Sequence, residues 1–266
     1  MPLSPLLANY DLVLLDLDGC VWVGEQCTPR APEALAELRA TGKRVAFLTN
    51  DARSSPEEYV RKLWSLGMKA SLEEVVTVGG AIQHVLAQRA PGAAAFVIGS
   101  PAIFRHVVDA GARVVNGTER ASRAELVVVA AHDELRFSEL RTATRAVLSG
   151  AEMLAAGRDR TFPTEDGVSP ATGAILAALE YATEAVARSV GKPAPQLFDT
   201  ALDRLGPGRA LVVGDRLDSD LAGAAAAGLD GAIVLTGMTD REQAEAAREP
   251  APVAIAENLH DLLVAR

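Results

Sequence analysis

Two carboxylates stand two positions apart at the point where an apolar run ends. Asp16 and Asp18 follow Val13 to Leu15, which read as a strand that is buried on both faces, as in a parallel sheet. A spacing of two in extended chain keeps both side chains on one side, and open α/β sheets bind ligands at the carboxyl ends of their strands. Carboxylates crowded at one site cannot all be charged cheaply, so a hard cation such as Mg²⁺ is expected beside them. The pair is a candidate reactive site, although a polar strand end that caps a turn has the same pattern.

The elements that must position this pair alternate between strands and helices. Apolar runs and helical patterns predict strands at 11–16, 45–49, 210–213 and 232–235, and helices at 32–40, 56–66, 221–227 and 259–264. Such alternation indicates βαβ units around a parallel sheet. The stretch from about residue 80 to 188 repeats the pattern, with strands of its own at 95–98 and 126–131. We interpret this stretch as a second α/β domain that is inserted into the first.

Composition narrows the class of protein. The chain has 266 residues, is 49% hydrophobic and 23% charged, and carries a formal net charge of −9. Its length favours two domains, and its acidity argues against a nucleic-acid surface, which needs clustered basic residues. No apolar stretch reaches the roughly 20 residues that span a bilayer, and residues 1–10 lack a signal-peptide pattern, so we expect a cytoplasmic protein that binds no membrane. Cys20 and Cys27 provide no disulfide framework.

Three further polar groups follow predicted strands or turns far along the chain. They are Thr49 with Asn50, Lys192 in a Gly-Lys-Pro turn, and the acids of segment 214–220, which reads GDRLDSD. Each group alone has an ordinary structural explanation, such as the polar end of a strand. Their order and positions together are specific.

The set resembles the motifs of the haloacid dehalogenase superfamily. In that resemblance the four motifs are, in order, Asp16 with Asp18, Thr49, Lys192, and Asp215 with Asp220. Three segments are similar to those of the NagD-like, class IIA phosphatases: TNDARSS at 49–55, DRTFPTEDGVSPATGAI at 159–175 and VGKPAPQLF at 190–198. The resemblance covers essentially the whole chain. It implies an α/β fold with a Rossmann-like parallel sheet core, residues 1–79 plus 187–266, and an inserted α/β cap domain of the C2 type at residues 80–186.

The resemblance also implies a cofactor and a mode of assembly. It assigns the ligands of Mg²⁺ as the side chain of Asp16, the main-chain carbonyl of Asp18 and the side chain of Asp215. Asp220 is then expected to orient Lys192 or a metal-bound water. Relatives often pair through their caps, which is compatible with a homodimer, but the sequence leaves the oligomeric state open.

Residue types at these positions suit phosphoryl transfer. Asp16 can attack phosphorus and form an aspartyl-phosphate, and Asp18 can give a proton to the leaving alcohol and later take one from water. Lys192, with the metal ion, offsets the charge of the acids and of a phosphate dianion.

The loop after the second predicted strand supplies candidates for substrate binding. Thr49 can donate its hydroxyl to a phosphoryl oxygen, and Asn50 and Arg53 follow it closely. We expect these three residues, with Lys192, to bind the phosphate.

The acid at position 18 separates two reactions of the superfamily. The dehalogenase branch lacks it because no alkoxide needs a proton, so Asp18 favours hydrolysis of phosphate esters. We expect a Mg²⁺-dependent phosphomonoester hydrolase that acts on a small phosphorylated metabolite: a polyol phosphate, phosphoglycolate, pyridoxal phosphate or a nucleotide. Segments 130–132 and 156–159 depart from the pattern of the family, which leaves the substrate open.

Two other functions are compatible with parts of this pattern. A catalytically silent protein of the same fold would bind a phosphorylated ligand without turnover. A signalling receiver domain also uses an acidic cluster, a Thr and a Lys, but it needs roughly half of this length.

Overall fold

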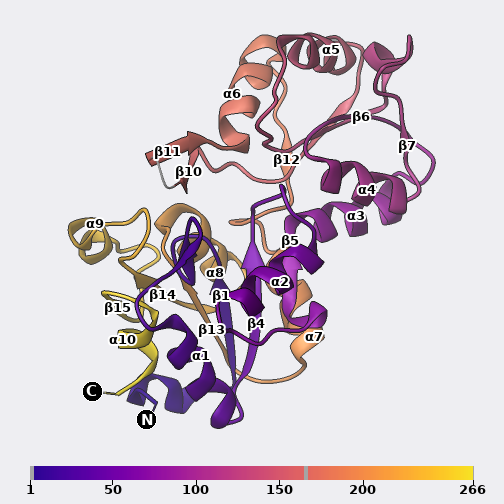
Figure 1. The fold of residues 1–266 in the computed structure, drawn as a ribbon. Coiled ribbons are helices and arrows are strands. Elements are labelled where there is room, and N and C mark those ends of the chain that lie inside the picture. Colours follow the sequence, from indigo (N-terminus) through magenta and orange to yellow (C-terminus); the bar gives the residue numbers. More distant parts are fainter. Residues whose placement is uncertain (1–2, 165–166, 266) are drawn as a thin grey trace.

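The computed structural model describes residues 3–164 and 167–265, and Figure 1 shows two sheets, one above the other. The larger one, the core sheet, has six strands in the order β15-β14-β13-β1-β4-β5. These strands are β1 (Leu12–Asp16), β4 (Arg44–Thr49), β5 (Val75–Thr77), β13 (Ala210–Gly214), β14 (Asp230–Val234) and β15 (Ile255–Ala256). All neighbouring pairs are parallel, so their carboxyl ends meet at one edge of the sheet.

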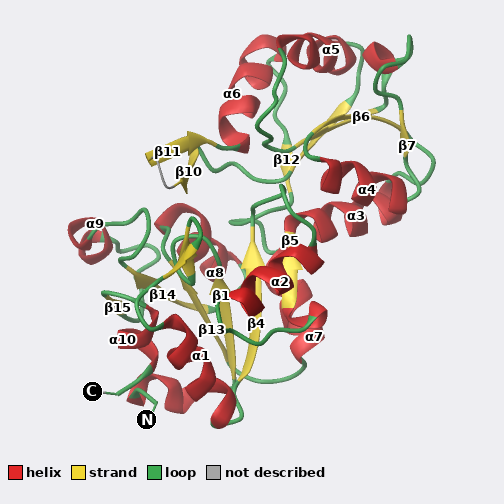
Figure 2. Cartoon of the chain, viewed as in Figure 1, coloured by secondary structure: helices red, strands yellow, loops and turns green. Residues whose placement is uncertain are grey.

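Helices cover both faces of the core sheet (Figure 2). The face with Val13 and Leu15 packs on α1 (Ala31–Ala40), α2 (Pro56–Ser65) and α10 (Leu259–Leu263). The face with Leu12 and Leu14 packs on α7 (Gln196–Leu205) and α8 (Ala222–Ala226). Successive side chains of a strand point to opposite faces, so a strand covered on both sides is apolar throughout. This explains why β1 reads as a continuous apolar run up to its terminal acid.

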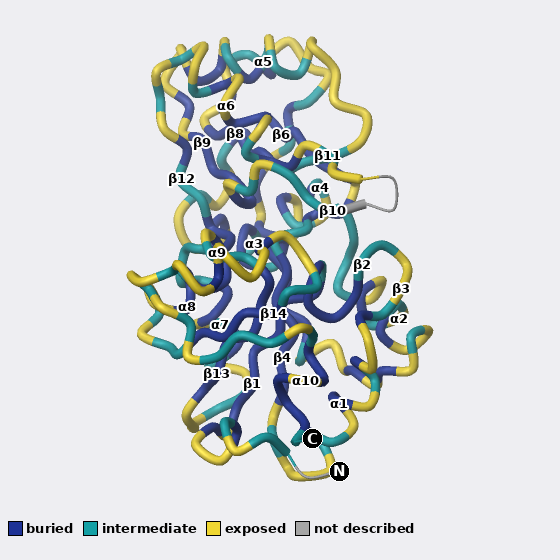
Figure 3. The backbone as a smooth tube through the Cα atoms, turned by 90° about the vertical axis from the view of Figure 1, so that its left-hand side faces the viewer, coloured by how far each residue is buried: buried dark blue, intermediate teal, exposed yellow. Residues whose placement is uncertain are grey.

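The smaller cap sheet has five strands in the order β12-β9-β8-β6-β7, all parallel. They are β6 (Ala94–Ile98), β7 (Arg113–Val114), β8 (Leu126–Val129), β9 (Glu152–Ala155) and β12 (Arg188–Ser189). Its helices are α3 (Val78–Arg89), α4 (Pro101–Asp109), α5 (Phe137–Leu148) and α6 (Thr172–Thr183). One hydrophobic cluster joins both sheets through α3, with Leu14, Ile82 and Val97 among its members. In Figure 3 the central strands of both sheets are buried, whereas α5 carries exposed residues at the far end of the molecule.

Two antiparallel hairpins lie outside the sheets. One joins β2 (Trp22–Val23) to β3 (Gln26–Cys27), and the other joins β10 (Thr161–Thr164) to β11 (Gly167–Pro170). Residues 165 and 166 of the segment 159–175 lie outside the described residues. Short 3-10 helices occupy Pro5–Asn9, Leu72–Glu74 and Ala121–Arg123, the helix α9 occupies Arg241–Ala246, and a π-helical turn at Leu217–Leu221 precedes α8.

The α/β fold with a parallel sheet and a cap is confirmed, with differences at some predicted ends. Strand β12 pairs with β9, so the cap sheet extends past the predicted boundary at residue 186. A strand of two residues has no periodic pattern that sequence could reveal. The predicted strand 126–131 ends at Val129, and the predicted helix 221–227 begins with the π-helical turn. Within the described residues, no helix is both long and apolar enough to cross a membrane.

Candidate active site

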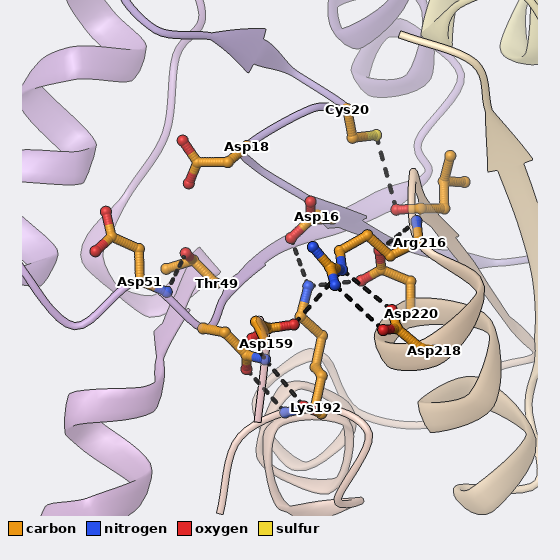
Figure 4. Close-up of polar contacts among 12 residues, drawn as sticks. Asp16, Asp18, Cys20, Thr49, Asp51, Asp159, Lys192, Arg216, Asp218 and Asp220 are labelled. Carbon is orange, nitrogen blue, oxygen red and sulfur yellow. Dashed lines mark hydrogen bonds and ion pairs between the residues drawn. The ribbon is translucent and has the colours of Figure 1, made fainter. Parts of the chain in front are cut away.

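The candidate site lies at the carboxyl edge of the core sheet. Asp16 ends β1, Thr49 ends β4, and Asp215 follows directly after β13. Because β1 pairs with β4 on one side and β13 on the other, these residues are neighbours. Lys192 comes from the loop between β12 and α7, at the point where the chain returns from the cap sheet. Figure 4 shows the side chain of Lys192 rising from this loop toward Asp16.

Three carboxylates and one ammonium group form the centre of the site. Carboxylate oxygens of Asp16, Asp215 and Asp220 lie within 4.8 Å of one another, and all three residues are buried. The Nζ of Lys192, which is also buried, donates to Asp16 and, at 2.6 Å, to Oδ1 of Asp220. The structure thus brings together four residues that are up to 204 positions apart in the chain (16 to 220).

Burial raises the pKa values of two of these acids, Asp16 and Asp215. Burial and the neighbouring Asp220 raise the pKa of Asp215 to about 7. Burial also raises the pKa of Asp16 well above its usual range, against the attraction of Lys192. Burial by itself lowers the pKa of Lys192, but Asp16 and Asp220 outweigh it and raise the pKa above the usual value, so the ammonium stays charged.

A cation with oxygen ligands fits this centre. Oδ2 of Asp215 accepts a hydrogen bond from the backbone N–H of Met238 at 2.7 Å, while its buried Oδ1 has no hydrogen-bond partner among the described residues. A buried acceptor of this kind needs a proton or a cation. Hard divalent cations bind carboxylate and carbonyl oxygens, which are the groups present here.

Two glycines are required by the close packing of the acids. Gly19, which follows Asp18, has φ of +92°, and a Cβ atom there would lie 2.5 Å from Oδ2 of Asp215. A Cβ atom at Gly214 would lie 2.2 Å from Cγ of Asp220. The glycines of both motifs therefore let the backbone approach the carboxylates.

The loop that carries Lys192 is held by Asn50. Oδ1 of Asn50 accepts from the backbone N–H of Lys192 at 2.8 Å, and its Nδ2 donates to the carbonyl of Lys192 at 2.9 Å. The same Nδ2 donates to Asp159 of the cap at 2.7 Å. Asn50 was predicted to bind substrate, and the structure shows its side chain engaged with the lysine loop. Its contact with substrate stays a prediction.

Thr49 and Arg53 lie on the same loop. Thr49 is buried, and its Oγ1 accepts from the backbone N–H of Asp51 at 2.9 Å, which leaves the hydroxyl proton to donate. The guanidinium of Arg53 forms two hydrogen bonds to the carboxylate of Asp51, at 2.8 and 2.9 Å, and stacks 4.1 Å from the ring centroid of Phe162 in β10. Arg53 thus joins the core loop to the cap hairpin.

A cavity of about 80 Å³ lies between the core sheet and the cap. The core contributes seven of the eight predicted site residues, namely Asp16, Asp18, Thr49, Asn50, Arg53, Lys192 and Asp215. Asp18 lines this cavity, and in Figure 4 its carboxylate points away from the pair of Asp16 and Lys192. Burial and the nearby Asp51 raise the pKa of Asp18.

Sequence reasoning missed the role of Arg216 at the cavity. Arg216, next to Asp215, donates to the carbonyl of Thr161 in the cap hairpin at 3.1 Å and lies 3.5 Å from Asp159. Its position in the motif GDR could have identified it, whereas the partner in the cap could not be predicted. Arg158 lies in the segment 156–159, which departs from the family pattern; it pairs with Glu180 at 2.7 Å and does not line the cavity.

Comparisons with known proteins match most of the chain. A model of the haloacid dehalogenase-like hydrolases matches residues 13–113, and a second model, described as HAD-hydrolase-like, matches residues 189–262. A D-glycerol 3-phosphate phosphatase from Mycobacterium tuberculosis is 40% identical over 252 residues, which is 93% of this chain and 70% of the relative. A glycerol-3-phosphate phosphatase from Gallus gallus is 33% identical, over 92% of this chain and 85% of that protein.

Solved structures agree with these relatives and show the family to which the chain belongs. The glycerol phosphate phosphatase of Mycobacterium tuberculosis, in complex with magnesium, superposes with a TM-score of 0.87 at 40% identity, over 96% of this chain and 77% of that one. A p-nitrophenyl phosphatase from Archaeoglobus fulgidus superposes with a TM-score of 0.85 at 30% identity, over 96% and 98%. The chain therefore belongs to the haloacid dehalogenase-like hydrolases and, within them, to the class IIA, NagD-like phosphatases.

Proposed function

We propose that this phosphatase hydrolyses a small polyol phosphate, with glycerol 3-phosphate as the first candidate, through an aspartyl-phosphate on Asp16. The observation that carries the proposal is the buried cluster of Asp16, Asp215 and Asp220 with Lys192, of which Asp16, Asp215 and Lys192 line the cavity. Relatives from Mycobacterium tuberculosis and Gallus gallus, both glycerol 3-phosphate phosphatases by name, support the substrate class.

The proposed reaction has two steps in which Asp16 and Asp18 act in turn. A carboxylate oxygen of Asp16 attacks phosphorus, and the bond from phosphorus to the ester oxygen breaks while Asp18 gives its proton to that oxygen. The alcohol leaves, and Asp18 is now a carboxylate. It takes a proton from a water, whose oxygen attacks the aspartyl-phosphate and releases inorganic phosphate and free Asp16.

The site needs positive charge before it can accept a phosphate dianion. We propose that Mg²⁺ is held by the side chains of Asp16 and Asp215 and by the main-chain carbonyl of Asp18, and that it supplies charge to the phosphoryl oxygens. Lys192 adds a second positive charge, and Asp220 holds its ammonium in place at 2.6 Å. Thr49 donates its hydroxyl to a phosphoryl oxygen.

Other small phosphate esters belong in the same substrate panel. They are phosphoglycolate, pyridoxal phosphate and a nucleotide. We also propose the predicted division into a core at 1–79 plus 187–266 and a cap at 80–186, with the second boundary moved beyond β12, which belongs to the cap sheet. A cytoplasmic location and pairing through the cap stay predictions from sequence.

Removal of divalent cations should stop turnover. Hydrolysis of p-nitrophenyl phosphate is expected to fall at least about a hundredfold in excess chelator, because the metal supplies several kcal/mol of transition-state stabilisation. Added Mg²⁺ should restore the rate. The measurement is release of p-nitrophenol before chelation, after chelation and after Mg²⁺ is returned. An unchanged rate in chelator would contradict the metal site.

The same assay separates an enzyme from the catalytically silent alternative. An enzyme releases inorganic phosphate from at least one member of a panel of phosphorylated metabolites in Mg²⁺. A silent binder releases none, although a phosphorylated ligand still raises its melting temperature.

Asp18→Asn should slow poor leaving groups more than good ones. Phenyl phosphate and p-nitrophenyl phosphate differ little in size, but phenolate needs the proton far more than p-nitrophenolate does. We expect kcat/KM for phenyl phosphate to fall about 10²-fold or more, and that for p-nitrophenyl phosphate to fall much less. Equal losses for the two esters would remove the proton-transfer role from Asp18.

A further inference from the structure

The acid Asp18 lies inside a loop that Trp22 closes. The backbone N–H of Trp22 donates to the carbonyl of Leu17 at 3.1 Å, and the carbonyl of Trp22 accepts from the N–H of Gly19 at 2.7 Å. These two bonds fix the backbone on both sides of Asp18. The indole Nε1–H of Trp22 then donates to Oδ1 of Asp18 at 2.8 Å. Backbone and side chain of one residue thus hold the loop and its carboxylate together.

The indole ring is itself held from several directions. Trp22 is 1% exposed, and its ring stacks on Tyr59 of α2 with centroids 6.4 Å apart and planes 8° from parallel. The ammonium of Lys62, one helical turn further along α2, lies 4.7 Å from the ring centroid and donates to the carbonyl of Gly24 at 2.7 Å. Hairpin β2–β3 is therefore pinned to α2, and the two lie side by side in Figure 3. Because the indole cannot move freely, its hydrogen bond also holds Oδ1 of Asp18 in position.

An indole N–H is well suited to hold an acid that gains and loses a proton. It is a donor only and does not titrate, so it binds Oδ1 whether Asp18 is a carboxyl or a carboxylate. No hydrogen bond from the described residues reaches Oδ2, and Asp18 lines the cavity. The two oxygens can therefore divide their tasks, one as an anchor and the other for proton transfer.

We propose that Trp22 is the positioning residue for Asp18: its indole N–H anchors Oδ1 so that Oδ2 gives the proton to the leaving oxygen and takes it back from water. No other covalent step is added to the proposed reaction. The inference rests on the acid/base role proposed above for Asp18. Trp22 is a buried core residue, and the proposal gives it a role in positioning Asp18 in addition to its role in packing.

The chain provides a matched control for removal of the indole N–H. Its other tryptophan, Trp64, donates to the carbonyl of Ala70 at 2.8 Å, away from the cavity, and is 60% exposed. Trp22→Phe and Trp64→Phe each exchange an indole for a phenyl ring and remove one hydrogen bond of the same length. Only Trp22→Phe removes a bond to the acid.

Steady-state kinetics with phenyl phosphate and p-nitrophenyl phosphate test the proposal. In Trp22→Phe, kcat/KM for phenyl phosphate should fall about tenfold and that for p-nitrophenyl phosphate less than about twofold, because only the poor leaving group needs a well-placed proton. Trp64→Phe should leave the ratio of the two values unchanged. A loss in Trp22→Phe that is equal for both esters would show a purely structural role and overturn the proposal.

A spectroscopic measurement keeps the proposal testable if Trp22→Phe fails to fold. The indole N–H resonances of the two tryptophans can be assigned by their loss in Trp64→Phe. In Asp18→Ala the Trp22 indole proton should move upfield because it loses its hydrogen-bond acceptor, while that of Trp64 stays in place. A Trp22 resonance that keeps its position would overturn the contact on which the proposal depends.

Failure of this inference can be distinguished from failure of the proposed function. If Asp18→Asn itself slows both esters equally, the acid/base role of Asp18 is wrong, and the inference falls with it. If Asp18→Asn discriminates between the esters and Trp22→Phe does not, only the role of Trp22 is wrong.

Discussion

Asp16→Asn should reduce turnover by at least about 10⁴-fold and abolish the phosphoenzyme. The amide nitrogen and oxygen of asparagine are too weak as nucleophiles to attack phosphorus, while the shape of the side chain is preserved. Lys192 keeps its contact with Asp220, so the rest of the cluster remains assembled. The loss should be similar for phenyl and p-nitrophenyl phosphate, since both esters require the same attack.

Rapid acid quench with labelled substrate measures the phosphoenzyme directly. Wild-type protein should retain label on the polypeptide, and Asp16→Asn should retain none. Asp203→Asn is a suitable control, because this exposed acid on α7 lies outside the cavity and the same chemical change there should leave labelling intact. Label retained by Asp16→Asn would mean that another group carries the phosphoryl intermediate.

The sequence predicts that the four charged residues lie close together, because the ends of the predicted strands show where two of them stand. Asp16 and Asp215 each follow an apolar run, and parallel strands bring their carboxyl ends to one edge. Lys192 and Asp220 were placed by motif order, and the structure brings them into contact. Their catalytic roles stay predictions, since geometry by itself shows where the groups lie.

Contacts between cap and core could not be predicted, because they depend on how two folded units meet. Nothing near Asn50 in sequence reveals that its amide holds both the Lys192 loop and Asp159. Likewise, the stacking of Arg53 on Phe162 joins residues that are 109 positions apart (53 to 162). Pattern and propensity act within one element, whereas these side chains find partners only after tertiary packing.

The charge balance of the cluster depends on Lys192, the one ammonium group in contact with its carboxylates among the described residues. Lys192→Met should lower kcat/KM by about 10³-fold, because a phosphate dianion then meets three carboxylates with one cationic group fewer. Lys69→Met, an exposed lysine of similar size, should leave kcat/KM unchanged. A small loss in Lys192→Met would mean that the metal ion by itself neutralises the phosphate.

Lys192→Met should also destabilise the metal-free protein in a pH-dependent way. At pH 8 the free energy of unfolding should fall by about 3–5 kcal/mol, since Asp16 and Asp220 lose a buried partner. A carboxyl whose pKa is higher in the folded than in the unfolded state, as for Asp215 at about 7, binds more protons when folded. Its contribution to stability is present at low pH and is lost as the pH rises toward 7. The deficit of the variant should therefore shrink at pH 5, because burial raises the pKa of Asp16 and this unpaired acid takes up a proton there. Denaturant unfolding of wild type and variant at pH 8 and pH 5, in chelator, measures this deficit in the free energy of unfolding. A deficit that is larger at pH 5 would contradict the view that Lys192 balances the charge of the buried acids.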